Sequence, residues 1–110
     1  MWYSASLLFR GVHDVVPEVP SLWEELIVLV EADSERDAKQ HAERLGAMRR
    51  HHYVVTHPET HVLKWVFVQV ERVCSIEEDR LEPGVELFSR FLRQSEVDSL
   101  LTPFNDDPVR

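Results

Sequence analysis

Four histidines fall on or beside one predicted hairpin, where their imidazole nitrogens could converge on a metal ion. The chain has a single cysteine, and no motif places a carboxylate next to these histidines. Two of them lie across a turn, whereas zinc sites built on a helix place their histidines on one face. We therefore interpret them as solvated turn residues and expect no bound metal and no cofactor. The candidate ligands are His51, His52, His57 and His61.

The nucleophile and acid–base candidates are equally sparse. Cys74 ends an apolar segment beside Val73, and no local signature supplies the base that a nucleophilic thiolate needs. We expect a packed structural thiol. Glu24 and Glu25 are adjacent in a predicted strand, so they point to opposite faces and cannot act as a paired acid and base. No catalytic residue is predicted, which favours a protein that is not an enzyme.

The cationic residues have structural explanations. The cluster 49–52, Arg-Arg-His-His, follows a predicted helix, where positive charge complements the helix dipole, and we prefer this to a phosphate site. Arg10 and Arg90 lie inside apolar segments, where a guanidinium needs a carboxylate partner. The partners we expect are Glu24, Glu31 or Glu86.

Aromatic residues could frame a binding surface, because Trp and Tyr are enriched at binding hot spots. Core packing explains most of them equally well. The residues in question are Trp2, Tyr3, Trp23, Trp65 and Phe88. For a small ligand, we take Trp2, Trp65 and Arg90 as the pocket candidates.

Length and charge bound the remaining possibilities. The chain has 110 residues, which suits one domain with a core over about residues 2–101, and we expect the tail 102–110 to be disordered. Its net charge of −8 disfavours nucleic acid and anionic membranes as partners and favours a basic protein. The longest apolar run, Leu26 to Val30, is too short to span a bilayer. Without an export signal or a disulfide, we expect a cytoplasmic location.

The first half of the chain predicts two strands followed by a helix. Residues 3–12 and 22–32 are rich in β-prone and apolar side chains and are bounded by turn residues. Ser34 is a good helix N-cap, and Gly46 is a typical residue after a helix end. A helix over 35–45 follows, with an apolar stripe at Ala38, Ala42 and Leu45.

The second half predicts three strands and a short helix. Strands are expected over 52–56 and 61–73, joined by a turn at 57–60. A Pro-Gly turn at 83–84 precedes a last strand over 85–92, and a helix over 95–101 follows. We therefore predict an α+β fold: a single antiparallel or mixed sheet of about five strands with one main helix on one face. The order is strand, strand, helix, strand, strand, strand, short helix.

Several predicted strands carry large apolar side chains on both faces. Leu26, Val28 and Val30 point one way, whereas Ile27 and Leu29 point the other. The same pattern recurs over 65–68 and over 87–92. One helix can cover only one face, so the other needs a homodimer partner or a ligand. We predict a non-enzymatic protein-interaction domain that self-associates through its sheet. The alternative is a small-ligand sensor or enzyme that uses the second sheet face.

An ordered set of short motifs resembles the bacterial domain-of-unknown-function family 4288. The motifs are Trp2-Tyr3-Ser4-Ala5, Leu22-Trp23-Glu24-Glu25, Glu31-Ala32-Asp33-Ser34, Trp65 and Gly84-Val85-Glu86-Leu87-Phe88-Ser89-Arg90. The resemblance covers about residues 2–92 and implies a small independent cytoplasmic domain, without any established activity. Two positions depart from the family pattern, which usually has Tyr at Phe88 and an Asn/Gly-type turn at His57-Pro58-Glu59-Thr60.

Overall fold

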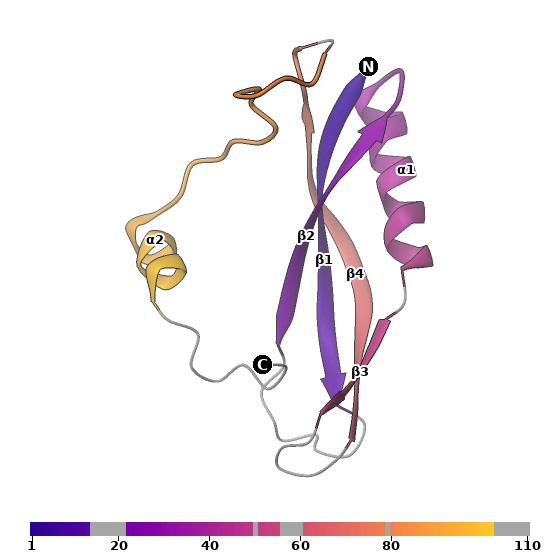
Figure 1. The fold of residues 1–110 in the computed structure, drawn as a ribbon, viewed down its shortest axis with the longest axis vertical. Coiled ribbons are helices and arrows are strands. Elements are labelled where there is room, and N and C mark those ends of the chain that lie inside the picture. Colours follow the sequence, from indigo (N-terminus) through magenta and orange to yellow (C-terminus); the bar gives the residue numbers. More distant parts are fainter. Residues whose placement is uncertain (14–21, 50, 56–60, 79, 103–110) are drawn as a thin grey trace.

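The computed structural model describes residues 1–13, 22–49, 51–55, 61–78 and 80–102, with backbone only for residues 13, 51–55 and 61 (Figure 1). In chain order the elements are β1 (Trp2–His13), β2 (Trp23–Glu31), α1 (Glu35–Met48), β3 (His51–Val55), β4 (His61–Ser75) and α2 (Gln94–Leu101). The strands form one antiparallel sheet in the order β2-β1-β4-β3. The predicted α+β class and antiparallel sheet are confirmed.

The predicted number of strands is wrong. The sheet has four strands, not about five, because the segment predicted as the last strand, 85–92, belongs to no strand. The turn before that segment is present, since Gly84 adopts a positive φ of 92° and the Val85 N–H donates to the carbonyl of Glu82 at 3.1 Å. The predicted hairpin is also present, with β3 paired to the first residues of β4. Its turn, 57–60, lies outside the described residues, as does the tail from 103 onward.

The alternation of side chains along the strands places one core between the sheet and α1. Tyr3, Ala5, Leu7 and Phe9 of β1 face the helix and are all buried. Their neighbours in β2, Leu26, Val28 and Val30, pack against the same core, as the sequence pattern predicted. From α1, Ala38 and Ala42 complete it. Small side chains let the helix backbone lie close to the sheet, which excludes water from the space between them.

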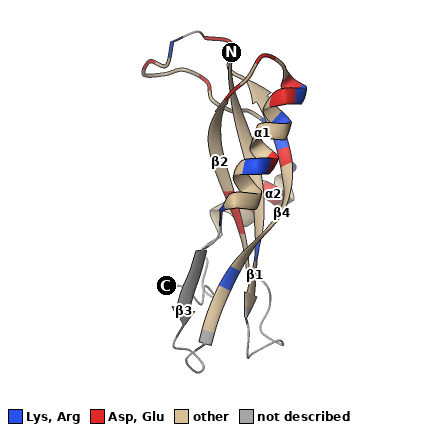
Figure 2. Cartoon of the chain, turned by 90° about the vertical axis from the view of Figure 1, so that its right-hand side faces the viewer, with Lys and Arg blue, Asp and Glu red and all other residues tan. Residues whose placement is uncertain are grey.

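Helix α1 begins where the sequence predicted and ends later. The Ser34 hydroxyl accepts a hydrogen bond from the Asp37 N–H at 3.1 Å, which caps the first turn. The predicted end at residue 45 is wrong, because the helix continues to Met48. Gly46 lies inside the helix and continues the buried stripe, whereas Leu45, which was predicted to be buried, is exposed. The outer surface of α1 carries charges of both signs (Figure 2).

Gly46 is required by the aromatic ring beneath it. A Cβ atom at this position would lie 2.3 Å from Cε1 of Phe67, which in turn packs against Phe9 with ring centroids 5.5 Å apart. We therefore expect Gly46→Ala to lower the free energy of unfolding by about 1–2 kcal/mol, because overpacking outweighs the gain of up to ~1 kcal/mol in helix propensity. Urea denaturation measures the difference.

The Phe67→Leu variant is the control for this prediction. With the ring removed, Gly46→Ala should cost less or become stabilising, since only the propensity term remains. An equal loss of stability in both backgrounds would contradict the contact between Gly46 and Phe67.

Neither helix in the described part of the chain is long and apolar enough to cross a membrane.

Candidate functional site

The sheet face opposite α1 is the candidate functional surface, and we call it the open face. Its residues follow from the strand register, which pairs Ser4 with Leu29 and Cys74, and Arg10 with Trp23 and Val66. It therefore comprises Trp2, Ser4, Ser6, Leu8, Arg10 and Val12 of β1, Trp23, Glu25, Ile27 and Leu29 of β2, and Lys64, Val66, Gln69, Arg72 and Cys74 of β4. Of the two described helices, α1 packs on the other face through Ala38 and Ala42, and α2 contacts none of the described strands.

A segment of the chain's own C-terminal region crosses part of the open face. We call residues 85–90 the strap. The Ser4 hydroxyl donates a hydrogen bond to the carbonyl of Leu87, and Arg72 Nη1 donates to the carbonyl of Ser89 at 3.0 Å. Side chains of the sheet thus bind two of the strap's carbonyl groups, so this segment is held on the sheet without pairing as a strand.

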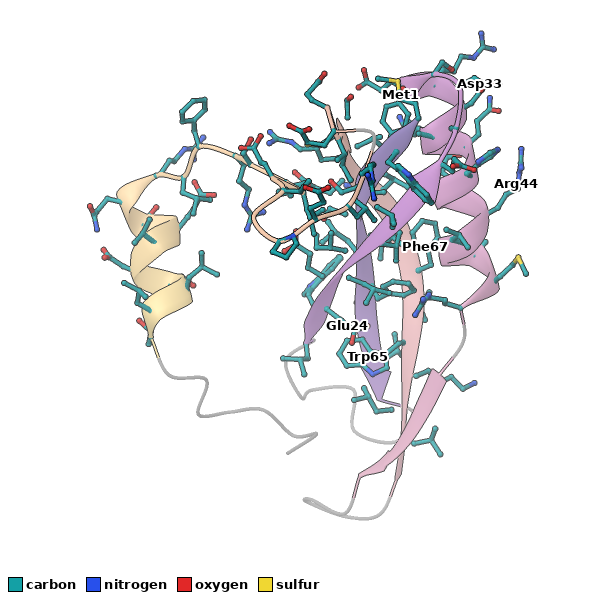
Figure 3. All side chains as sticks on the ribbon, turned by 45° about the horizontal axis from the view of Figure 1, so that its top comes forward. Met1, Glu24, Asp33, Arg44, Trp65 and Phe67 are labelled. Atoms are coloured by element: carbon teal, nitrogen blue, oxygen red, sulfur yellow. The ribbon has the colours of Figure 1, made fainter. Side chains whose placement is uncertain are left out.

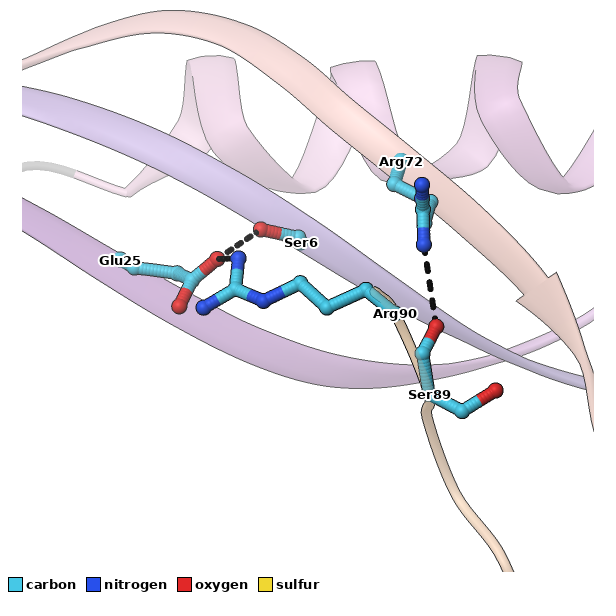
Figure 4. Close-up of polar contacts among 5 residues, drawn as sticks. All are labelled: Ser6, Glu25, Arg72, Ser89 and Arg90. Carbon is cyan, nitrogen blue, oxygen red and sulfur yellow. Dashed lines mark hydrogen bonds and ion pairs between the residues drawn. The ribbon is translucent and has the colours of Figure 1, made fainter. Parts of the chain in front are cut away.

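A charged contact holds the end of the strap. Arg90 Nη1 lies 3.4 Å from Oε2 of Glu25, and the same carboxylate oxygen accepts a hydrogen bond of 2.7 Å from the Ser6 hydroxyl (Figure 4). The guanidinium groups of Arg72 and Arg90 lie 5.8 and 5.9 Å from the centre of the Phe88 ring. Ser4 and Ser6 are buried beneath this arrangement, and both hydroxyl groups have partners. The polar middle of the open face is therefore closed by the chain itself.

Removing the Arg90 charge should loosen the strap without unfolding the domain. The side chains of Arg90 and Glu25 are 32% and 35% exposed, so the pair contributes little to global stability, up to about 1 kcal/mol. We expect Arg90→Gln to speed chymotrypsin cleavage after Phe88, measured by mass spectrometry, while the urea midpoint hardly changes. The matched control is Arg93→Gln, because Arg93 pairs with Glu96 at the start of α2 and not with the sheet. Equal cleavage rates in the natural chain and Arg90→Gln would contradict the role of this contact.

The open face also carries exposed apolar side chains that the strap does not cover. Trp23 and Ile27 of β2 and Val66 of β4 have exposed fractions of 52%, 44% and 47%. Val12 and Leu29 on the same face are also exposed, and Arg10 lies between Trp23 and Val66 in the register. This part of the face combines exposed apolar side chains with an arginine among them, and aromatic residues and arginine are enriched in protein-binding surfaces.

A groove lies between α1 and the C-terminal half of β4, apart from the open face. Because β3 pairs only with residues 61–65, the edge of β4 beyond Trp65 has no neighbouring strand among the described residues. An open groove of ≈ 760 Å³ runs there, lined by Glu35, Arg36 and Lys39 of α1 and by residues 70–74 of β4. The pairing of β1 with β4 shifts register twice nearby, and bulges of this kind twist an edge and hinder its pairing with another strand.

The three residues predicted as ligand-pocket candidates do not lie together. Trp65 is buried on the α1 side, in the core with Leu63 and Phe9, and its buried indole Nε1 has no hydrogen-bond partner among the described residues. Trp2 lies on the open face at the opposite end of β1, since the register pairs Trp65 with Gly11. Arg90 lies in the strap and pairs with Glu25. Figure 3 labels Trp65, and it also labels Phe67 between the sheet and α1.

The other predicted site residues have the following positions. Glu24 and Glu25 point to opposite sides of β2 as predicted, but the partner of Arg90 is Glu25 rather than Glu24, Glu31 or Glu86. Cys74 is half-buried in β4 and lines the groove next to α1. Arg49 is the C-cap residue of α1, and its N–H donates to the carbonyl groups of Leu45 and Gly46.

The side chains of the four histidines predicted as candidate metal ligands are not among those that the structure describes. His51, His52 and His61 lie in strands with only their backbone described, and His57 is outside the described residues. Among the side chains that are described, no group of three or more His, Cys, Asp or Glu residues could hold a metal ion.

Sequence reasoning missed the residues that hold the strap. Ser4 and Ser6 are small polar residues at alternate positions of an otherwise apolar strand, a signal that another chain segment approaches there. The pairing of Glu25 with Arg90 joins positions 65 residues apart, and no local pattern could reveal it. Arg72 directly follows Glu71 in a segment of mixed polar and apolar residues, so nothing in the local sequence singles it out.

Comparison with known proteins identifies the family. Residues 2–89 match the family described as Domain of unknown function (DUF4288). The chain belongs to the DUF4288 family. No curated protein and no solved structure matches it significantly. The DUF4288 match includes the whole sheet, α1 and most of the strap, and it ends before α2. The family resemblance predicted from the motifs is confirmed, and it assigns no activity to the open face.

Proposed function

We propose that this DUF4288 chain is a non-enzymatic protein-interaction domain that self-associates through the open face of its sheet. The observation that carries the proposal is that Trp23, Ile27 and Val66 on one face remain exposed although the strap contacts the same face. Full burial of an exposed large apolar side chain is worth about 1.5–3 kcal/mol, and about half of that remains to be gained at each of these half-exposed positions, so a surface containing several of them favours being covered. A twofold dimer would cover the same residues on both copies.

The division of the open face supports this proposal. The chain covers the polar middle, where Ser4, Ser6 and Glu25 meet the strap, and leaves the apolar part uncovered. If the strap served only to complete the fold, the apolar side chains would be the ones to gain most from its cover. The uncovered part is therefore better explained as a surface for another molecule.

Light scattering after size-exclusion chromatography at micromolar concentration tests the proposal. We expect a mass of twice the chain mass of 12.9 kDa. A mass equal to that of a single chain across the concentration series would refute self-association.

Binding of a small ligand is the second candidate function. The groove between α1 and β4, ≈ 760 Å³ in volume, falls within the range of ligand pockets, roughly 300–1,000 Å³. Its charged lining from Arg36, Lys39 and Glu35 would suit a polar molecule rather than an apolar one. The two candidates occupy different surfaces, so Lys39→Glu should affect ligand binding and leave the mass in solution unchanged.

A further inference from the structure

Helix α2 packs against none of the other described helices and strands. No Cα atom of α2 comes within 8 Å of another described helix or strand, and none of its residues is buried. Figure 1 and Figure 3 both show the helix standing clear of the sheet. A helix of 8 residues is too short to be stable in water by itself, since isolated helices shorter than about 12–15 residues are marginal. Its stability therefore requires a surface on which its apolar side chains can pack.

The apolar side chains of α2 form one stripe. Val97, Leu100 and Leu101 are spaced at three and four residues, so they share a face of the helix. Leu100 and Leu101 are 64% and 78% exposed, and Phe91, just before the helix, is fully exposed. Ser95 and Ser99 lie on the opposite side. We call residues 91–101 the arm.

The strap leads to an arm that stands apart from the sheet on the side opposite α1 (Figure 1). Arg90 is held by Glu25 of β2, which is an edge strand, so the arm begins over the edge of the sheet. Only Phe91-Leu92-Arg93 connects this contact to α2, and none of these is a typical turn residue. Arg93 is extended, with φ −77° and ψ 159°. In this structure α2 does not pack onto the open face of its own copy, since none of its Cα atoms lies within 8 Å of a described strand.

The apolar part of the open face fits the arm in size and charge. An eight-residue helix is about 12 Å long, and the four-residue step along β2 from Trp23 to Ile27 covers about 13 Å. The charged residues at this end of the face are the exposed cations Arg10 and Lys64, and Glu25, whose carboxylate pairs with Arg90. Helix α2 carries Glu96 and Asp98 beside its apolar stripe. The arm and the face thus complement each other in hydrophobicity and in the sign of their charge.

From these observations we propose that two copies of the chain exchange arms, so that α2 of each copy packs on the Trp23–Ile27 part of the partner's open face. The inference rests on the proposed self-association and names the segment that mediates it. Each strap anchors its arm on one copy while the helix covers the other. Both apolar surfaces that a single chain leaves exposed are buried by the same contact.

A variant of the arm tests the inference. In Leu100→Glu/Leu101→Glu the apolar stripe is lost, and we expect the dimer dissociation constant to rise about 100-fold or more, since each hot-spot side chain accounts for about tenfold or more. The control is Ser95→Glu/Ser99→Glu, which adds the same charge to the opposite side of α2 and should leave the dissociation constant nearly unchanged. Because α2 contacts no core element, both variants should keep the thermal stability of the domain measured at high dilution.

Mixing two defective variants tests the exchange itself. The arm variant keeps an intact open face, and Ile27→Arg keeps an intact arm, so a mixture restores one of the two contacts. We expect each variant to be monomeric alone and the mixture to contain a heterodimer, detected by native mass spectrometry. A mixture that stays monomeric would show that the arm does not pack on a second copy, and this would overturn the inference.

The remaining outcomes separate the two proposals. If the natural chain is dimeric and the arm variant is equally dimeric, the arm is not the mediator, and the inference fails while self-association stands. If the natural chain is monomeric, both fail.

Discussion

Replacement of Ile27 by Arg is expected to produce a folded monomer at concentrations where the natural chain is dimeric. Ile27 is 44% exposed and lies on the open face next to the buried Ser6 in the register. A guanidinium introduced there would be buried without a partner on association, and an unpaired buried charge costs about 3–5 kcal/mol. The dissociation constant should therefore rise by a factor of about 100 or more.

The folded monomer itself should tolerate this change. In a single copy the side chain of residue 27 reaches water, so the Arg head group stays solvated and its aliphatic part covers the sheet. The temperature of unfolding at high dilution should change little. Light scattering reports the mass, and circular dichroism reports the fold in the same samples.

Leu45→Arg is the matched control for this prediction. Leu45 is 39% exposed, close to the exposure of Ile27, but it belongs to α1 on the other side of the sheet. The same substitution there should leave the mass in solution unchanged. The reverse result, in which Leu45→Arg dissociates the dimer and Ile27→Arg does not, would move the interface to the helical side and contradict the proposed function.

The elements with regular side-chain periodicity could be predicted from the sequence. In β1, β2 and β4 the burial of side chains alternates because each strand turns one face toward α1, and the buried residues Leu7, Val30 and Leu63 follow this period of two. The start of α1 was also predictable, since the cap at Ser34 depends on residues three positions apart. These features are local, so a sequence pattern reports them directly.

The strap and Gly46 could not be predicted, and the reason is the same for both. Residues 85–92 have the composition of a strand, yet their carbonyl groups meet the side chains of Ser4 and Arg72 instead of a neighbouring backbone. Gly46 resembles a helix terminator, yet it lies inside α1 because the Phe67 ring occupies the space of a Cβ atom. In each case a residue distant in the sequence decides the local structure. A single sequence carries no record of that contact.

The Phe88 ring should be the most important single side chain of the strap. It is half-buried, and the guanidinium groups of Arg72 and Arg90 lie within 6 Å of its centre, at 5.8 and 5.9 Å. Each such contact is worth about 0.5–1 kcal/mol at an exposed site. Together with the lost apolar contact, we expect Phe88→Ala to lower the free energy of unfolding by about 2 kcal/mol, measured by urea denaturation.

Two further substitutions at Phe88 separate the ring from its bulk. Phe88→Tyr keeps the aromatic face between the guanidinium groups and should retain the stability of the natural chain, and Tyr is also the residue that the family resemblance leads us to expect there. Phe88→Leu keeps an apolar side chain without the aromatic face and should lose about 1 kcal/mol. Equal stability of the Leu and Tyr variants would show that the cations contribute nothing. Because the strap anchors the arm, Phe88→Ala should also weaken self-association, whereas Phe88→Tyr should not.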